Sequence, residues 1–324
     1  MAYMTMVEAV NDALQYEMGR DDRIVILGED VGTIGGVFRA TAGLQARYGP
    51  DRVVDTPLAE SAIVGASVGL ALNGMRPVPE IQFDAFVYPA FEQIAVHVSR
   101  YRWRTRGRTE LGITLRIPYG GGIRAPELHS DSPEAYFAHL PGVKVVVPSS
   151  PTDAKGLLTS GIRDPDPVVV FEPKAIYRTL KEDVPEGSYT VPIGEAAMAR
   201  PGTDLTLISW GAMVPRCLDA AAKLAPAHEV GVLDLRTLSP LDADAIVDAV
   251  VQSGRAVVVH EAPRSCGVGA EVAALIQERA LLSLEAPIAR VTGWDTSYPY
   301  FSLEDWYLPS VERIMSACRR TLEF

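Results

Sequence analysis

Cysteine is scarce in this chain, and the usual small metal-binding motifs are missing. The 324 residues include three cysteines, Cys217, Cys266 and Cys318, which lie far apart and form no CxxC pair. No two of the five histidines have the close spacing of a zinc site, and no HExxH motif occurs. This composition argues against a disulfide framework and a zinc site. A reducing cytoplasm is the expected location.

Long uncharged runs and an excess of positive charge are also lacking. The longest uncharged stretch, residues 61–75, is too short and too rich in glycine to span a bilayer. The first six residues lack the basic and apolar regions of a signal peptide. A net charge of −11 argues against a nucleic-acid-binding surface. We therefore expect a cytoplasmic protein that contacts neither membranes nor nucleic acids.

The composition that is present is that of a globular α/β protein. Hydrophobic residues make up 48% of the chain and charged residues 22%, and 324 residues are long for one core, so we expect two domains. Short apolar runs alternate with helical patterns, which indicates parallel α/β construction. The expected strands are 23–27, 77–83, 112–117, 143–147, 168–171, 205–209, 230–235, 256–260 and 288–292.

A break rich in proline and glycine divides the chain between residues 174 and 202. We predict a first domain at 1–185, a linker at 186–200 and a compact doubly wound domain at 201–324. A buried helix face is expected across 91–101, and Ser150 followed by Pro151 should begin another helix. The expected helices of the second part are 214–224, 243–252, 270–284 and 309–322.

Glu60 is the first candidate for chemistry. It closes the run Asp55-Thr56-Pro57-Leu58-Ala59-Glu60, directly before an apolar helix that begins at Ser61. A carboxyl group at the edge of a core is poorly solvated, so it could share a proton with a ring nitrogen. The alternative is an ordinary buried capping acid.

Two histidines and a triple glycine can each be interpreted as either functional or structural. His129 lies among acidic residues in a segment with few apolar side chains, where a histidine is more often solvated than catalytic. His260 ends an apolar strand, where α/β sheets place functional groups, but a satisfied edge histidine is equally compatible. Gly120-Gly121-Gly122 is either a flexible active-site loop or a permissive turn. Gly267-Val268-Gly269-Ala270 lacks the third glycine of a dinucleotide fingerprint and is expected to be a turn.

Several stretches in a fixed order carry a family resemblance. They are 28–32 with 35–39 (GEDVG and GGVFR), 52–60, 79–83 (PEIQF), 129–134 (HSDSPE), 141–146 with 153–158, 234–237 (DLRT) and 269–271. Together they resemble the E1 β subunit of thiamine-diphosphate-dependent 2-oxoacid dehydrogenase complexes, in the transketolase superfamily. The resemblance implies an amino-terminal pyrimidine-binding domain with a parallel sheet. It also implies a carboxyl-terminal domain of the transketolase C-terminal type.

The resemblance assigns roles to residues of the first domain. By position Glu60 looks like the acid that hydrogen-bonds N1′ of the thiamine aminopyrimidine, where proton exchange activates the cofactor. Leu58, Gln82 and Phe86 look like the wall around that ring, with core packing as their alternative. His129 resembles the family's active-site histidine, which orients the 2-oxoacid or assists acyl transfer to lipoamide. Asp131 stands where the family usually has glutamine, which changes the charge next to that histidine.

Partners and metals follow from the same resemblance. In this family an α subunit binds the diphosphate through Mg²⁺, and the α-type motif Gly-Asp-Gly followed by asparagine is absent from this chain. The resemblance therefore implies an α₂β₂ heterotetramer that serves a lipoyl-bearing E2 transacylase. The β subunits also hold a structural cation, usually K⁺, and oxygen ligands suit it. By position its ligands would be Leu111, Ile113, Thr114, Gly161, Asp164 and Asp166, with Ile162 as an alternative carbonyl donor and a solvated loop at 164–166 as the other reading.

The expected substrate is a branched-chain 2-oxoacid. The segments that resemble the branched-chain type are 171–174 with 177–178, 260–263 and 284–287. Pyruvate and acetoin dehydrogenases are the alternatives, because they share much of this pattern. A sugar-phosphate enzyme of the transketolase superfamily would require a basic phosphate-binding cluster, which the sequence does not reveal. A non-catalytic assembly protein of the same fold is the last alternative, and the presence of both Glu60 and His129 argues against it.

Overall fold

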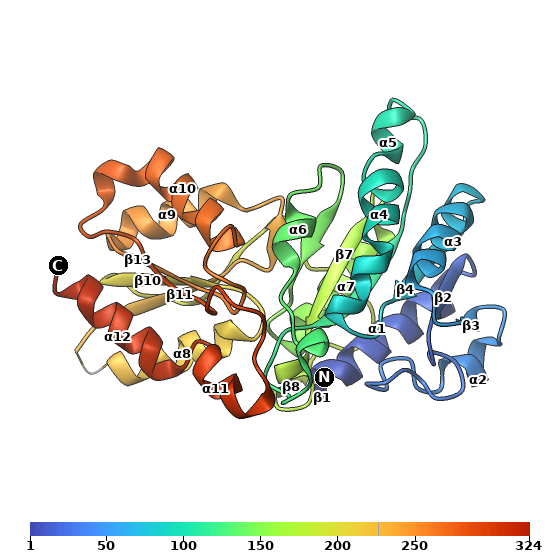
Figure 1. The fold of residues 1–324 in the computed structure, drawn as a ribbon, viewed down its shortest axis with the longest axis horizontal. Helices are drawn as coiled ribbons and strands as arrows, with labels where there is room; N and C mark the ends of the chain where they lie inside the picture. The colour runs from blue at the N-terminus through green and yellow to red at the C-terminus, as the bar shows by residue number, and fades with distance from the viewer. Residues whose placement is uncertain (226) are drawn as a thin grey trace.

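Two sheets lie side by side, and helices cover both faces of each (Figure 1). The computed structural model describes residues 1–225 and 227–324. One sheet has the strand order β12-β6-β7-β5-β4-β2-β3, the other has β14-β13-β10-β11-β9, and β1 pairs with β8 in a short ribbon. This arrangement confirms the expected α/β fold with two parallel-sheet units. None of the described helices has the length and apolar character that crossing a membrane requires.

Apolar residues in short runs build the first sheet, in which neighbouring strands are parallel except for β12 against β6. Its strands are β2 (Ile24–Gly28), β3 (Val53–Asp55), β4 (Arg76–Glu80), β5 (Thr114–Tyr119), β6 (Lys144–Val146), β7 (Val168–Pro173) and β12 (Thr237–Ser239). Every residue of β2, β5 and β7 is buried. Strands covered on both faces read as continuous apolar runs, which is why their positions were predictable.

The second sheet is parallel apart from its edge strand β9, which runs antiparallel to β11. Its strands are β9 (Ala197–Arg200), β10 (Leu205–Ser209), β11 (Val230–Asp234), β13 (Ala256–Val259) and β14 (Ala289–Val291), while β1 (Ala2–Thr5) and β8 (Lys181–Val184) form the ribbon. β9 thus lies in the last part of the expected linker, and β12 of the second part joins the first sheet. The division into 1–185, 186–200 and 201–324 stays a proposal.

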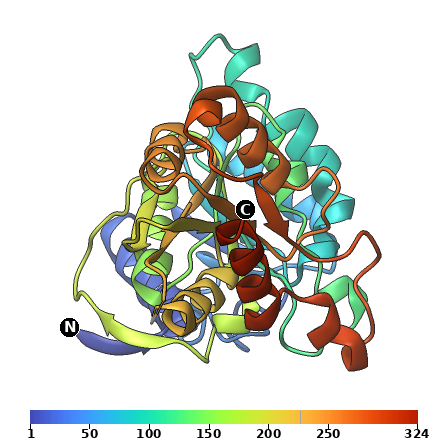
Figure 2. The same ribbon diagram turned by 90° about the vertical axis from the view of Figure 1, so that its left-hand side faces the viewer.

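Helices pack on the two sheets in two layers (Figure 2). Side chains of α1, α7, α8 and α12 share one hydrophobic core with one face of both sheets, and those of α3, α9 and α10 share a second core with the other face. The α-helices are α1 (Met6–Arg20), α2 (Leu44–Tyr48), α3 (Glu60–Leu72), α4 (Phe91–Gln93), α5 (Tyr101–Arg104), α6 (Glu134–Ala138), α7 (Pro151–Arg163), α8 (Met213–Leu224), α9 (Ala243–Ser253), α10 (Val268–Ala280), α11 (Glu304–Tyr307) and α12 (Val311–Leu322). The 3₁₀ turns are η1 (Asp84–Ala90), η3 (Glu127–His129), η4 (Lys174–Ile176), η5 (Leu281–Ser283) and η6 (Phe301–Leu303).

The sequence pattern predicted where α7 begins but did not predict an interruption of the helix across residues 91–101. Ser150 caps α7 as expected, because its hydroxyl accepts a hydrogen bond from the amide of Asp153 at 3.1 Å. The expected helix across 91–101 is instead interrupted by the π-helix η2 (Ile94–Val98). The amide of Ser99 donates to the carbonyl of Ile94, five residues earlier, at 2.9 Å.

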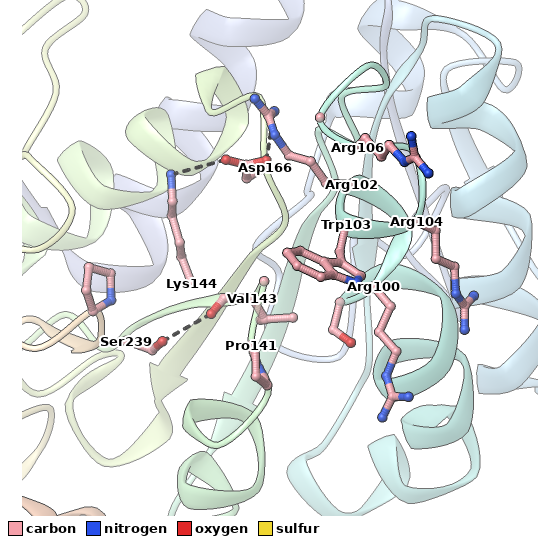
Figure 3. A pocket seen from close by; sticks show the side chains of 14 residues that line it. Arg100, Arg102, Trp103, Arg104, Arg106, Pro141, Val143, Lys144, Asp166 and Ser239 are labelled. Atoms are coloured by element: carbon pink, nitrogen blue, oxygen red, sulfur yellow. Dashed lines mark hydrogen bonds and ion pairs between the residues drawn. The ribbon is translucent and has the colours of Figure 1, made fainter.

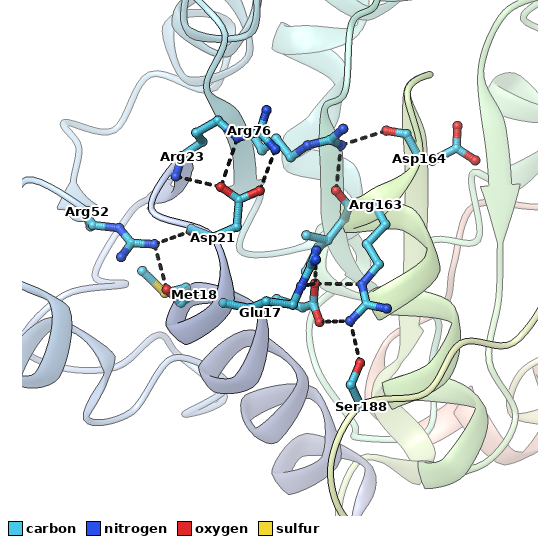
Figure 4. A network of polar contacts seen from close by, with 11 residues as sticks. Glu17, Met18, Asp21, Arg23, Arg52, Arg76, Arg163, Asp164 and Ser188 are labelled. Atoms are coloured by element: carbon cyan, nitrogen blue, oxygen red, sulfur yellow. Dashed lines mark hydrogen bonds and ion pairs between the residues drawn. The ribbon is translucent and has the colours of Figure 1, made fainter.

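A buried acid ties the two helices on one face of the first sheet together (Figure 4). Glu17 of α1 is fully buried and accepts hydrogen bonds from the guanidinium of Arg163 of α7 and from Nε of Arg20 at 3.1 Å. Ser188 accepts a further hydrogen bond from Arg163. Because a charged hydrogen bond in the interior outweighs an exposed one, this contact fixes α1 against α7.

Candidate active site

Glu60 is the first residue of α3, and α3 follows β3 at the carboxyl end of the first sheet. In open α/β sheets this edge is where ligands bind. The residue is 8% exposed although its neighbour Leu58 is 79% exposed, so the carboxyl group lies at the boundary of the core, as expected. Its place in the first turn of a 13-residue helix puts the carboxyl group at the amino end of α3.

Glu29 is a second carboxyl group beside Glu60, and sequence reasoning missed its role. It follows β2, and burial raises its pKa, with further increases from the nearby charges of Glu60 and Asp30. Its Oε1 is buried and has no hydrogen-bond partner in the described part of the chain. Two neighbouring carboxyl groups with an unused acceptor suit a ligand that donates hydrogen bonds. The available signal was an acid directly after a fully buried strand.

The three residues expected to form a cofactor wall have different surroundings. Gln82 donates from Nε2 to the carbonyl of Glu29 and to Oδ2 of Asp30, both at 3.3 Å, so its amide has the partner that burial requires. Phe86 is half-buried, and its ring contacts an aromatic cluster. Leu58 is far too exposed to be a core residue, which removes the packing alternative for it.

His129 lies in an aromatic cluster that the sequence did not reveal. Its ring centroid is 4.2 Å from that of Phe83 and 5.0 Å from that of Phe86. Burial lowers the pKa of His129, and the nearby Lys174 lowers it further. The imidazole is therefore neutral at physiological pH, with a buried Nδ1 that has no partner among the described residues. A neutral imidazole with a free nitrogen can accept a proton or orient a carbonyl group.

A buried ion pair holds the segment that carries His129. Asp84, the first residue of η1, pairs with Lys174, and both side chains are fully buried. Burial raises the pKa of Asp84 to about 6 and lowers that of Lys174. Oδ1 of Asp84 also accepts a hydrogen bond from the amide of Asp131 at 2.9 Å, two residues after His129. Since the three residues are far apart in the sequence, only the folded chain reveals this connection.

Asp131, which replaces the glutamine usual in the resembled family, has a partner of its own. Its Oδ2 accepts a hydrogen bond from the hydroxyl of Tyr88 at 2.8 Å. Burial raises the pKa of Asp131, while the bond to Tyr88 opposes that increase. The carboxyl group of Asp131 is thus bound within the chain by the hydroxyl of Tyr88.

The triple glycine and His260 have structural explanations. Gly120 and Gly122 have φ values of +80° and +91°, which other residues rarely adopt. A side chain on Gly121 would overlap the ring of Tyr298, and its amide donates to Glu261 at 3.0 Å. His260 is fully buried and stacks on Trp210 with centroids 5.1 Å apart, and burial lowers its pKa to about 4. We therefore interpret both features as parts of the interior.

Three of the residues expected to bind K⁺, Ile162, Asp164 and Asp166, already have partners for their oxygens. Nη1 of Arg76 donates to the carbonyls of Ile162 at 2.9 Å and Asp164 at 3.0 Å (Figure 4). The carboxylate of Asp164 pairs with Lys144, and that of Asp166 pairs with Arg102. A cation at this position would have to share the oxygens with the Arg76 guanidinium, so the residues as arranged do not fit it. No cluster of three or more His, Cys, Asp or Glu side chains suited to a metal occurs in residues 1–225 and 227–324.

Glu134 lies in the same region and should contribute to the pH dependence of stability. It is fully buried, its Oε1 accepts a hydrogen bond from Trp210 at 3.2 Å, and burial raises its pKa from 4.5 to about 8. The folded chain therefore keeps this proton between about pH 4.5 and 8 while the unfolded chain releases it. The stability that this group contributes is complete below pH 4.5 and is lost as the pH rises through 8.

We expect Glu134→Gln to flatten this dependence. The amide stays neutral and can still accept from Trp210, so the melting temperature of the variant should match that of the wild type at pH 5 and exceed it at pH 8. Thermal melts across this range measure the effect, with Glu110→Gln, an exposed site, as the control. Equal slopes for wild type and Glu134→Gln would contradict the raised pKa.

Comparisons with known proteins agree with this arrangement. The family model "Transketolase, pyrimidine binding domain" matches residues 2–179, and "Transketolase, C-terminal domain" matches residues 194–314. Proteins named pyruvate dehydrogenase E1 component subunit beta are 53% identical in Staphylococcus epidermidis and 50% identical in Bacillus subtilis, over 100% of both chains. A solved structure titled "Split gene transketolase, inactive beta4 tetramer" has a TM-score of 0.81 at 21% identity, covers 99% of this chain, and supports the fold alone.

Proposed function

The chain belongs to the E1 β subunits of thiamine-diphosphate-dependent 2-oxoacid dehydrogenase complexes, and on this basis we propose that it acts with an α subunit on pyruvate. The observation that carries the proposal is 53% identity, over the whole of both chains, to a protein named as the β subunit of pyruvate dehydrogenase E1. The expected preference for branched-chain substrates finds no support in these relatives. The pyruvate alternative replaces it.

Thiamine diphosphate is the cofactor that the family implies, and the residues of the site fit it. Glu60 offers a buried carboxyl group, His129 has an unpartnered buried nitrogen, and Leu58 presents an exposed apolar surface. When bound, the cofactor supplies the carbon nucleophile that decarboxylation of a 2-oxoacid requires. In this proposal Glu60 holds and exchanges a proton at N1′ of the aminopyrimidine ring. Leu58, Gln82 and Phe86 position that ring and exclude water from it.

His129 has the second role in the proposal. Its neutral imidazole accepts a hydrogen bond or a proton from the substrate side of the site. The Asp84–Lys174 pair orients the segment, and Phe83 and Phe86 fix the ring from its sides. We propose that this histidine assists transfer of the acyl group to the lipoyl group of an E2 partner.

The assembly and the ions are further parts of the proposal. We propose an α₂β₂ heterotetramer in which the α subunit binds Mg²⁺ and the diphosphate, and a cytoplasmic location. The split-gene transketolase, which is 21% identical to this chain, was solved as an inactive β4 tetramer according to its title, and that description applies to the transketolase only. Binding of K⁺ at residues 111–114 and 161–166 stays a prediction of the resemblance, against which the contacts of Arg76 count.

The proposed substrate can be tested on the reconstituted enzyme. We expect the complex of this chain with the α-type chain from the same organism, given thiamine diphosphate and Mg²⁺, to have a kcat/KM for pyruvate at least about tenfold above that for 3-methyl-2-oxobutanoate. A difference of one methylene group or more in an apolar pocket changes rates by this order. A preference for 3-methyl-2-oxobutanoate would restore the branched-chain alternative. Association without activity on either substrate would favour a non-catalytic assembly protein.

The role of His129 can be separated from decarboxylation. We expect His129→Ala to keep decarboxylation measured with an artificial electron acceptor within about threefold, and to lower acetylation of a lipoyl domain by about 10²-fold, the usual contribution of a positioned acid or base. His139→Ala, at an exposed histidine ten residues later, is the control. Wild-type acetylation by the His129 variant would remove the assignment.

A further inference from the structure

A group of arginines stands out on this acidic chain. Five of the nine residues at 100–108 are arginine, in the run RYRWRTRGR, although acidic residues outnumber basic ones by 41 to 30. The run follows the π-helix η2 and includes α5, which protrudes from the rest of the molecule (Figure 1). Like charges so close together repel each other, so their concentration requires a compensating benefit.

The arginines lie along one side of a large cavity, which we call the arginine groove and define by Arg100, Trp103, Arg104, Arg106, Pro141 and Val143. It has a volume of about 1260 Å³ (Figure 3). Pro141, Val143 and Pro240 form an apolar part of the wall of the groove. Residues from both halves of the chain therefore line it. This volume exceeds that of most small-molecule pockets, which hold roughly 300–1,000 Å³.

The charges in the groove fall into two classes. Arg102 and Lys144 are held in ion pairs with Asp166 and Asp164 and are thus neutralised within the chain. Arg100, Arg104 and Arg106 are exposed and form no ion pair within residues 1–225 and 227–324. The groove therefore carries a net positive charge that the chain itself does not balance. Its occupant should be negatively charged.

Trp103 indicates what kind of anion fits. Its side chain is 86% exposed, and it lines the groove with Pro141 and Val143 (Figure 3). Tryptophan and arginine are the residue types that contribute most binding energy at protein interfaces. A small inorganic anion would use the arginines and leave the indole exposed. A peptide with acidic residues and an apolar side chain uses both.

We propose that the arginine groove binds an acidic segment of the α-type partner chain, with an apolar side chain of that segment packed on Trp103. The inference rests on the proposed function for the existence of that partner. We infer an acidic segment from charge complementarity, because exposed arginines attract acidic partners and orient them. A second copy of this chain, which is itself acidic, and a nucleic acid are the other occupants that the test must distinguish.

Charge reversal tests the groove directly. We expect the double variant Arg104→Glu/Arg106→Glu to raise the Kd for the α chain at least tenfold at 0.15 M NaCl and to slow association, with a smaller difference at 0.5 M NaCl because salt screens exposed charges. Both positions are exposed, so the variant should fold as the wild type does. Arg319→Glu, at an exposed arginine of α12, is the matched control and should leave the Kd unchanged.

A photo-crosslinking amino acid at position 103 identifies the occupant. In the assembled complex, we expect crosslinks to an α-chain peptide that contains several acidic residues, and Trp103→Ala should raise the Kd about tenfold. Crosslinks to a second copy of this chain or to nucleic acid, or a wild-type Kd for the double variant, would overturn the inference. If the wild-type complex decarboxylates pyruvate while the double variant associates normally, the inference fails and the proposed function stands. If the wild-type chain neither binds an α chain nor turns over, the proposed function itself fails.

Discussion

Glu60→Gln should lower the rate of pyruvate decarboxylation by the assembled complex by about 10²- to 10⁴-fold, the range that a positioned acid or base contributes. Glutamine has nearly the same size, so the start of α3 and the burial of the side chain should persist. What it cannot do is exchange a proton with N1′ of the cofactor. The expected loss therefore falls on turnover, and the affinity for the α chain should remain.

The measurement is the steady-state rate with saturating pyruvate, together with the mass of the complex in solution. Glu278→Gln, at an exposed acid of α10, provides the control for the same chemical change and should keep the wild-type rate. Glu29→Gln tests the neighbouring carboxyl group and should have an intermediate effect, because Glu29 is close enough to Glu60 for the charge of Glu60 to raise its pKa. Full turnover by a correctly assembled Glu60→Gln complex would reject the role of this residue.

Arg116→Met should destabilise the folded chain far more than a substitution that breaks an exposed ion pair. Arg116 of β5 is fully buried and donates from Nε and Nη2 to Glu172 of β7 at 2.7 and 2.8 Å, and from Nη1 to Glu80 of β4. Methionine fills similar space but leaves two buried carboxyl groups without a cation. Breaking a buried ion pair in this way costs about 3–5 kcal/mol of the free energy of unfolding. The loss should grow as the pH rises, because the unpaired acids are then forced to ionise.

Urea unfolding of the purified chain measures this effect. Arg279→Met, which breaks an exposed pair with Asp244, should cost no more than about 1 kcal/mol. Arg116→Met in a Glu80→Gln/Glu172→Gln background should recover much of the loss, because no buried charge is then left unpaired. A midpoint for Arg116→Met equal to that of the exposed control would contradict the network. Glu80 ends β4 two residues before Gln82. The same change should therefore also displace Gln82 and lower the affinity for the cofactor.

The sequence by itself determined the features that depend on neighbours along the chain. Apolar runs with both faces buried gave strands close to their observed bounds, and β10 at Leu205–Ser209 matches its expected range. Ser150 and Pro151 gave the start of α7, because capping involves the next three residues only. Glu60 was identified in the same way, because an acid between a strand and an apolar helix must lie at the edge of the core.

Tertiary structure decided the features that join distant segments. Lys174 meets Asp84 across 90 residues, and β12 joins the first sheet from the second half of the chain. The closeness of Glu29 to Glu60 and of Phe83 to His129 depends on how strands and turns lie side by side. No local sequence pattern predicts these contacts. The spacing of residues indicates which face of a helix or strand a side chain occupies, but not which distant residue it will contact. The sequence therefore gave the residue types of the site, and packing of the parallel strands decided which of them act together.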